Sequence, residues 1–382
     1  FISVNTPTKK SGLGAGYASD LKWVEESARK VSQYSQGHTI VVEKSTVPVK
    51  TAELIKSILI SKKLNSNNDQ DKKTYSVLSS PEFLAEGTAI KDLENPDRVL
   101  VGGEDENAIF CLTEIYKKWI PEEKILLTNI WSSELSKLTA NAFLAQRISS
   151  INSISALCEA TGAQINEVSN AIGSDKRIGK KFLEAGPGFG GSCFQKDILN
   201  LVYLCKYYGL NQVAEYWDQV IKLNNWQRKR ISDLIVEKFF GTVSDKKIVI
   251  LGFAFKANTN DFRESSAIYI AKELLENGAN ILIHDPQVSY DQINESLEVC
   301  IKKVENEKRI SFSNNLNEVF HNADAIIILT EWEIYKKLNW QKIVPTLRHP
   351  SWIFDTRSII NKSDIKDLGI NIWRVGDGEC FS

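Results

Sequence analysis

The 382-residue sequence contains no methionine, only four histidines and no apolar run long enough to cross a bilayer. The longest apolar stretches, around residues 248–255 and 323–329, fall far short of the roughly 18 residues that a spanning helix needs. We interpret both as buried strands and expect no membrane partner. Because methionine is missing and the chain opens on the strand-like Phe1-Ile2-Ser3-Val4, we expect that Phe1 is not the biological start.

An excess of charge of one sign is also missing. Lys and Arg together number 47 and Asp and Glu 48, which leaves a formal net charge of −1. Non-specific binding to nucleic acid needs a basic excess, so we expect no nucleic-acid partner. A hydrophobic content of 42% and a charged content of 25% are typical of a globular chain, here long enough for two or three domains.

Cysteine pairs at metal-binding or redox spacing are absent. The six cysteines form no C-x-x-C motif: Cys111, Cys158, Cys193, Cys205, Cys300 and Cys380. In a chain this long, such scatter favours reduced thiols and a cytoplasmic location over a disulfide scaffold. Four isolated histidines argue against a His-based metal site, so we predict no metal.

Hydrophobic patterning predicts strands that alternate with helices in the first third of the chain. The strands are expected at 1–4, 39–44, 75–79 and 98–102, and the helices at 20–34, 49–63 and 105–118. This order indicates βαβ units and a mostly parallel sheet. The polar stretch 65–73 is expected to be a surface loop.

A helical block follows, and then the αβ pattern returns. Residues 132–160 lack Pro and Gly and predict one helix of about 42 Å, with further helices at 165–172, 194–208 and 213–239. Beyond the block we expect strand 247–253, helix 265–277 and strand 280–284, extended by 316–321, 325–329 and 352–354. The predicted fold class is α/β, with two Rossmann-like domains joined by a helical block with a long central helix. The domain boundaries are expected at 1–130, 131–240 and 241–382.

The most informative segment is rich in glycine and precedes a predicted helix. It reads Gly186-Pro187-Gly188-Phe189-Gly190-Gly191-Ser192-Cys193-Phe194-Gln195-Lys196-Asp197. A cysteine at a helix N-terminus has a stabilised thiolate, and Asp197 follows it one turn later on the same face. A covalent site is one interpretation, and a C-cap turn followed by a buried cysteine is the other.

Other polar residues are weaker candidates. Lys137 and Asn141 project from one face of the long helix, although a solvated pair explains them as well. Residues 41–48 and 80–87 each follow a strand, where open α/β sheets bind ligands, but an N-cap or a solvated loop would also fit. Cations at strand ends suit a diphosphate, and the candidates are Lys256, Arg263 and Arg357.

Taken in order, these segments strongly resemble the animal-type UDP-glucose 6-dehydrogenases of the UDP-glucose/GDP-mannose dehydrogenase family. The resemblance runs from Phe1 to about Arg357 and rests on five sequence words. They are VVEKSTVPV at 41–49, PEFLAEGTA at 81–89, WSSELSKL at 131–138, GFGGSCFQKD at 188–197 and ILGFAFK at 250–256.

The resemblance implies an NAD-dependent oxidation of UDP-glucose to UDP-glucuronate through a thiohemiacetal and a thioester on Cys193. The implied catalytic residues are Cys193, Lys137, Asp197, Asn141, Thr46 and Glu82. The implied substrate contacts are Phe83, Leu84, Arg177, Phe189, Gly190, Phe255, Lys256 and Arg357. The implied NAD contacts are Val4, Asn5, Thr6, Pro7, Thr8, Ser45, Thr46, Glu86 and Arg263. The resemblance also implies a cofactor domain, a central dimerisation domain and a UDP-binding domain, in a homodimer or homohexamer.

One departure from the family pattern stands out. Family members begin with a strand, a G-x-G-x-x-G turn and, about 20 residues later, an acid for the ribose. This chain has none of these, because Gly12-Leu13-Gly14-Ala15-Gly16 follows a polar loop instead of a strand. We therefore expect an N-terminally truncated chain whose cofactor sheet lacks its first half, with residues 1–4 as a raw edge and with weak NAD⁺ binding. Two alternatives stay open, a dehydrogenase for another nucleotide sugar and a non-catalytic subunit that binds UDP-sugar or modulates an oligomer.

Overall fold

The computed structural model describes residues 1–61, 73–301 and 309–379, with the side chains of 299–301 left out. The described chain forms two compact units. One consists of Phe1–Phe143 with Lys196–Asp218, and the other of Leu144–Gln195 with Gln219–Ser382. The predicted loop at 65–73 falls almost entirely outside the described residues, as do Cys380 and the side chain of Cys300.

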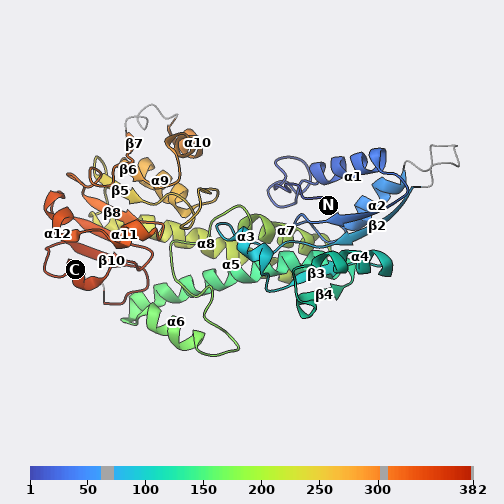
Figure 1. The fold of residues 1–382 in the computed structure, drawn as a ribbon. Coiled ribbons are helices and arrows are strands. Elements are labelled where there is room, and N and C mark those ends of the chain that lie inside the picture. The colour runs from blue at the N-terminus through green and yellow to red at the C-terminus, as the bar shows by residue number, and fades with distance from the viewer. Residues whose placement is uncertain (62–72, 302–308, 380–382) are drawn as a thin grey trace. The chain divides into compact units, whose positions relative to one another are not determined.

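The sheet of the first unit has four strands in the order β1-β2-β3-β4, of which Figure 1 labels β2, β3 and β4. They are β1 (His38–Glu43), β2 (Thr74–Ser79), β3 (Val99–Gly102) and β4 (Ile125–Thr128). β1 pairs in parallel with β2 from His38↔Thr74 to Glu43↔Ser79, and β3 pairs in parallel with β4. β2 and β3 run antiparallel, so the prediction of a mostly parallel sheet holds with this one exception.

The helices of this unit are α1 (Lys22–Tyr34), α2 (Thr51–Ser61), α3 (Ala89–Glu94) and α4 (Glu106–Tyr116), with a 3₁₀ turn at Glu122–Lys124. α4 begins after Asp105, whose carboxylate accepts the backbone N–H groups of Asn107 and Ala108 (3.0 and 3.2 Å). Val24 and Ala28 of α1 and Ile55 and Leu59 of α2 are buried in one apolar cluster with Val41 of β1. In each helix the two buried residues are four positions apart, which places them on one face, and this apolar spacing is what predicts the helices from the sequence.

The prediction of a strand at residues 1–4 is wrong. Ile2 makes a single parallel bridge with Glu43, and its backbone N–H donates to the carbonyl of Val42 (2.8 Å). At Val4 the backbone pairing with β1 does not continue, because the hydroxyl of Ser45 forms hydrogen bonds with both the N–H and the carbonyl of Val4. Ser45 Oγ accepts from Val4 N (2.7 Å) and donates to Val4 O (2.8 Å). The segment therefore lies beside β1, fixed by a side chain instead of by strand pairing.

Three long helices carry residues of both units: α5 (Ile130–Thr161), α7 (Phe194–Tyr207) and α8 (Asn211–Lys238). α5 extends the predicted 132–160 by two residues at its start and one at its end. α6 (Ile165–Gly173) belongs to the second unit. None of the helices within the described ranges is both long and apolar enough to cross a membrane.

The second unit has a six-stranded, wholly parallel sheet in the order β10-β9-β8-β5-β6-β7, yellow to red in Figure 1. Counted from β5, this is the 3-2-1-4-5-6 order of a Rossmann fold, as predicted. The strands are β5 (Lys247–Leu251), β6 (Asn280–His284), β7 (Ile310–Phe312), β8 (Ala325–Ile328), β9 (Trp352–Asp355) and β10 (Asn371–Arg374). β6 matches its predicted bounds, whereas the predicted extension at 316–321 forms a turn.

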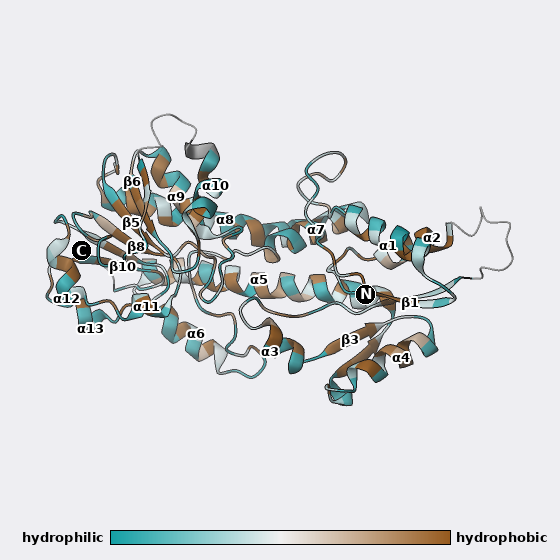
Figure 2. Cartoon of the chain, turned by 45° about the horizontal axis from the view of Figure 1, so that its top comes forward, coloured by the Kyte–Doolittle hydropathy of each residue, from teal (hydrophilic) through white to brown (hydrophobic). Residues whose placement is uncertain are grey.

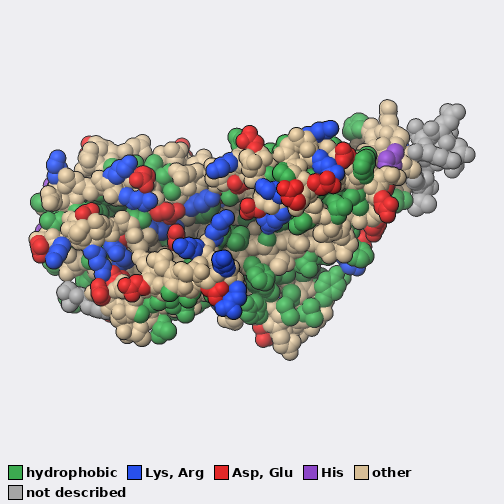
Figure 3. Space-filling view, turned by 60° about the horizontal axis from the view of Figure 1, so that its bottom comes forward, with side chains coloured by type: hydrophobic (Ala, Val, Ile, Leu, Met, Phe, Trp, Pro, Cys, Tyr) green, Lys and Arg blue, Asp and Glu red, His purple; other side chains and the backbone are tan. Residues whose placement is uncertain are grey.

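Helices surround this sheet: α9 (Ser266–Glu276), α10 (Tyr290–Ile301), α11 (Glu333–Lys336), α12 (Trp340–Ile343) and α13 (Lys362–Ile365), with a 3₁₀ turn at Val344–Thr346. All four residues of β8 are fully buried, as a strand covered on both faces requires. Figure 2 shows the strands β5, β6 and β8 coloured as hydrophobic. On the face drawn in Figure 3, basic and acidic side chains are interspersed, in keeping with the net charge of −1.

Two buried carboxyl groups meet in the first unit. Glu43, at the end of β1, and Glu134, on α5, are 1% and 2% exposed. Burial, and after it the charge of the neighbouring Glu134, raise the pKa of Glu43 well above its usual value, and neither carboxyl oxygen of Glu43 has a hydrogen-bond partner. Glu134 also accepts the backbone N–H groups of Lys50 and Ala52 (2.7 and 2.8 Å) at the start of α2. Burial therefore favours the neutral form of Glu43, which lies beside the Glu134 carboxyl that links α5 to the start of α2.

This pair predicts a pH-dependent stability. An unfolded Glu43 loses its proton near the usual pKa, whereas the folded state keeps it to higher pH, so folding stability falls as pH rises between the two values. Each pKa unit of difference is worth about 1.4 kcal/mol. Glu43→Gln keeps a hydrogen-bond donor and removes the titration. We expect urea unfolding from pH 5 to 8 to show a smaller loss of stability in this variant than in the wild type.

The control is Glu123→Gln, which removes an exposed carboxylate of the same unit. Its stability should follow the wild-type pH dependence. If Glu43→Gln loses stability with pH as steeply as the wild type, Glu43 is ionised in the folded state and the assignment is wrong.

Candidate functional site

The glycine-rich segment leads directly into a helix. α7 begins at Phe194, so Cys193 is the residue immediately before it, as the sequence predicts. The Cys193 side chain is exposed, and Ser192 Oγ lies 3.5 Å from its Sγ. Asp197 lies in the first turn of α7 and is 2% exposed. An accessible thiol thus precedes a buried carboxylate by one helical turn.

In this segment the backbone at Gly190 lies so close to neighbouring atoms that a side chain would not fit. A Cβ atom at Gly190 would lie 2.6 Å from the carbonyl oxygen of Glu264 and 2.9 Å from Cβ of Phe255. The neighbouring Phe189 is fixed by Asn224, whose Oδ1 accepts its N–H (2.8 Å) and whose Nδ2 donates to its carbonyl (3.1 Å). Buried Arg228 donates to the carbonyls of both Phe189 and Glu264. The second unit therefore holds residues 188–190 against the loop that follows β5.

Asp197 is held by two partners in the first unit. Asn141 Nδ2, from α5, donates to Asp197 Oδ2 (2.6 Å), and Lys196 Nζ lies 3.1 Å from Asp197 Oδ1. Lys196 Nζ also donates to Thr6 Oγ1 (3.3 Å), and Thr6 Oγ1 in turn donates to the carbonyl of Thr46 (2.7 Å). A polar chain therefore runs from α5 through α7 to the segment after β1.

Lys137 lies one turn before Asn141 on α5 and is 5% exposed. Its Nζ is 3.7 Å from Glu82 Oε1 and 5.1 Å from the centroid of the Phe83 ring. Arg98 stacks on the same ring, with Cζ 3.7 Å from its centroid. The backbone N–H of Leu84 donates to the Glu82 carboxylate. A buried ammonium group thus faces the predicted substrate residues 82–84.

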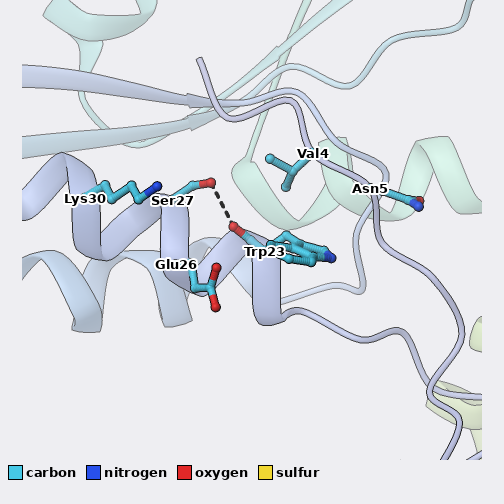
Figure 4. A pocket seen from close by; sticks show the side chains of 6 residues that line it. All are labelled: Val4, Asn5, Trp23, Glu26, Ser27 and Lys30. Atoms are coloured by element: carbon cyan, nitrogen blue, oxygen red, sulfur yellow. Dashed lines mark hydrogen bonds between the residues drawn. The ribbon is translucent and has the colours of Figure 1, made fainter.

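A hollow of about 200 Å³ unites several predicted residues of the first unit. Its lining includes the predicted Val4, Asn5, Thr6, Ser45, Thr46 and Glu82, together with Ser3, Lys44 and Lys196. A second hollow of about 320 Å³ (Figure 4) lies between Val4 and Asn5 on one side and α1 on the other. Its lining from α1 consists of Trp23, Glu26, Ser27 and Lys30.

The remaining predicted cofactor residues do not line these two hollows. The carbonyl of Pro7 accepts the N–H of Asp20, and Thr8 makes an antiparallel bridge with Ser19. Glu86 is half-buried. Arg263 belongs to the second unit, where Nε lies 2.9 Å from Asp261 Oδ1.

Predicted substrate residues of the second unit follow its strands. Phe255 and Lys256 come after β5 and Arg357 after β9, and Arg357 Nη2 donates to the carbonyl of Phe255 (3.1 Å). Arg177 is not part of this group, because its side chain is 90% exposed and pairs with Asp175 (2.6 Å). Strands β5 and β9 thus bring one lysine and one arginine to the carboxyl edge of the sheet.

The sequence interpretation missed Lys196 and Lys44 as site residues. Both lie inside the quoted words, Lys196 beside Asp197 and Lys44 at the end of β1. A cation adjacent to a candidate acid was the available signal.

Among the residues that the structure describes, no group of three or more His, Cys, Asp or Glu side chains could hold a metal ion.

Three domain models of one protein family match the chain in sequence order. The NAD binding domain of the UDP-glucose/GDP-mannose dehydrogenase family matches residues 1–120, its central domain 131–226 and its UDP binding domain 249–362.

Known proteins match along almost the whole chain. A UDP-glucose 6-dehydrogenase from Caenorhabditis elegans is 53% identical over 98% of this chain and 78% of its own length. A bovine UDP-glucose 6-dehydrogenase is 53% identical over 98% of this chain and 76% of its own.

Solved structures agree with these matches. A UDP-glucose dehydrogenase from Pyrobaculum islandicum has a TM-score of 0.81 at 30% identity, over 98% of this chain and 78% of its own. A UDP-D-ManNAc dehydrogenase from Pyrococcus horikoshii has a TM-score of 0.79 at 25% identity, over 98% and 80%. The chain therefore belongs to the UDP-glucose/GDP-mannose dehydrogenase family and is an NAD-dependent oxidoreductase.

Proposed function

We propose that this protein oxidises UDP-glucose to UDP-glucuronate in two steps at one site. The observation that carries the proposal is the buried Asp197 carboxylate, bonded to Asn141 and placed one helical turn after the exposed Cys193 thiol. The bovine and C. elegans relatives, both named UDP-glucose 6-dehydrogenase, support UDP-glucose as the substrate.

In the proposed chemistry the C6 alcohol first loses a proton and a hydride to give an aldehyde. The Cys193 thiolate adds to this aldehyde, and the resulting thiohemiacetal loses its hydroxyl proton and a second hydride to give a thioester. Water then attacks the thioester carbon, the carboxylate product forms and the thiolate is released. Asp197, with Thr46, holds that water and accepts its proton, while Lys137 and Asn141 stabilise oxyanions by electrostatic contact. Glu82 assists the hydrolysis step.

The residues of the first unit fit NAD. When bound, NAD⁺ supplies the hydride acceptor for both oxidations. Around the smaller hollow, the hydroxyl groups of Thr6, Ser45 and Thr46 and the ammonium groups of Lys44 and Lys196 suit the hydroxyl, amide and phosphate oxygens of a dinucleotide. Trp23 in the larger hollow is 47% exposed and offers an aromatic face to a base.

The rest of the functional assignment is also a proposal. We infer a cofactor domain at 1–130, a central domain at 131–240 and a UDP-binding domain at 241–382, in a homodimer or homohexamer. Phe83, Leu84, Phe189, Gly190, Phe255, Lys256 and Arg357 would contact the substrate, together with Arg177. Val4 to Thr8, Ser45, Thr46, Glu86 and Arg263 would contact the cofactor. Scattered cysteines support a cytoplasmic location.

A substrate comparison tests the function. UDP-glucose, UDP-N-acetylmannosamine and GDP-mannose are each mixed with NAD⁺ and the protein, and NADH formation is followed by absorbance. We expect kcat/KM for UDP-glucose to exceed the others by about 100-fold or more, because a polar site rejects sugars that leave its groups unpaired. Preference for another sugar would favour that alternative, and no turnover with intact UDP-sugar binding would favour a non-catalytic subunit.

Two substitutions separate the thiol from its neighbouring acid. Cys193→Ala removes the nucleophile, and acid formation should fall by more than about 10³-fold. Asp197→Asn should slow thioester hydrolysis by about 10²- to 10⁴-fold and leave KM for UDP-glucose within about twofold, because the lost charge acts on water. Quench-flow measurement should detect an accumulated acyl-enzyme in Asp197→Asn alone.

The matched control is Asp291→Asn, an exposed position at the start of α10, which should retain wild-type kinetics. Acid formation by Cys193→Ala at the wild-type rate would rule out the covalent route.

A third substitution tests the nucleotide end of the substrate. Lys256→Ala removes a cation at the carboxyl end of β5, and we expect the affinity for UDP itself to fall by about 10- to 100-fold. Lys337→Ala, whose side chain is 73% exposed in the same unit, is the control. Calorimetry with UDP measures both variants, and unchanged affinity in Lys256→Ala would remove this residue from the site.

A further inference from the structure

An acidic side chain lies between the two cations assigned to the UDP phosphates. In the second sheet, β8 is the neighbour of both β5 and β9. Lys256 follows β5, Arg357 follows β9 and Glu331 follows β8, the strand between them. The carboxyl edge of this sheet therefore presents cation, anion and cation on three adjacent strands.

Glu331 accepts a hydrogen bond on one carboxyl oxygen, and its other oxygen lies in an ion pair without a hydrogen bond. Arg357 Nε lies 3.2 Å from Oε2, and the backbone N–H of Ala257 donates to Oε1 (3.3 Å). Burial opposes ionisation of Glu331, but Arg357, two backbone N–H groups and Lys256 outweigh it and lower its pKa. Glu331 is therefore a carboxylate at neutral pH.

The orientation of Arg357 does not depend on Glu331. Arg357 Nε donates to the carbonyl of Leu329 (2.8 Å) and Nη2 donates to the carbonyl of Phe255 (3.1 Å). Its backbone N–H donates to Asp355 Oδ1 (3.1 Å). Because neutral carbonyls already hold the guanidinium, the distinctive contribution of Glu331 to the site is its negative charge.

We propose that Glu331 is a specificity-determining residue that weakens the binding of nucleoside diphosphates by cancelling one of the two positive charges at this edge. The proposal rests on the proposed function, in which Lys256 and Arg357 bind UDP. A diphosphate meets repulsion from Glu331 that uridine does not meet. This built-in anion limits the affinity for the product, so that the nucleotide-sugar acid can leave.

The test is calorimetric titration of Glu331→Gln with UDP and with uridine. Glutamine keeps the shape of the side chain and removes the charge. We expect the Kd for UDP to fall about tenfold, a gain that shrinks in 0.5 M salt, while the Kd for uridine stays within about twofold. Glu333→Gln is the matched control, because it removes an exposed carboxylate two residues away that pairs with the surface lysines Lys336 and Lys337. Its affinity for UDP should not change.

Glu331→Asp separates charge from geometry. It keeps the carboxylate and should bind UDP with wild-type affinity. The proposal is overturned if Glu331→Gln binds UDP equally or more weakly, if uridine binding tightens to the same degree, or if Glu331→Asp also tightens UDP binding. Failure of the proposed function would give a different result. In that case the wild type would not bind UDP, or Lys256→Ala would bind UDP with the same affinity as the wild type.

Discussion

The hydrogen bond between Asn141 and Asp197 is the contact on which the candidate site of the first unit depends. It joins α5 to α7 between two side chains that are 6% and 2% exposed. A carboxylate buried this deeply is costly unless its lone pairs are satisfied. Asn141 and Lys196 supply these partners.

α5 distributes three polar side chains along one buried stripe. Glu134, Lys137 and Asn141 follow one another at intervals of three and four residues, so they share a face of the helix. Each has a different partner: Glu134 accepts the backbone N–H groups of Lys50 and Ala52, Lys137 faces Glu82, and Asn141 binds Asp197. Burying a carboxyl, an ammonium and an amide group on one face of a helix costs desolvation free energy. The contacts with these partners offset that cost, and the partners of Lys137 and Asn141 belong to the candidate site.

The sequence predicted the elements whose signal is local. β6 has its predicted bounds, and α5 differs by no more than two residues at either end. β4 was missed because Leu126 and Leu127 are both exposed in a four-residue edge strand, which leaves no alternating pattern. α3 was missed because it buries no residue. In the site, Cys193, Asp197 and Asn141 were named, but the bond between Asn141 and Asp197 spans 56 residues and has no local signature.

Under the proposed function, the two units would recognise oxygen-rich ligands by different physical means. The hollow of the first unit offers hydroxyl groups and lysines that already share hydrogen bonds with one another, as Lys196 does with Thr6. Such donors can exchange a protein partner for a ligand oxygen at little net cost, because bonds broken are matched by bonds formed. The second unit holds Arg357 on backbone carbonyls and sets Glu331 beside it. In our proposal its affinity for a diphosphate is therefore decided by a balance of full charges, which a single neutral substitution would shift.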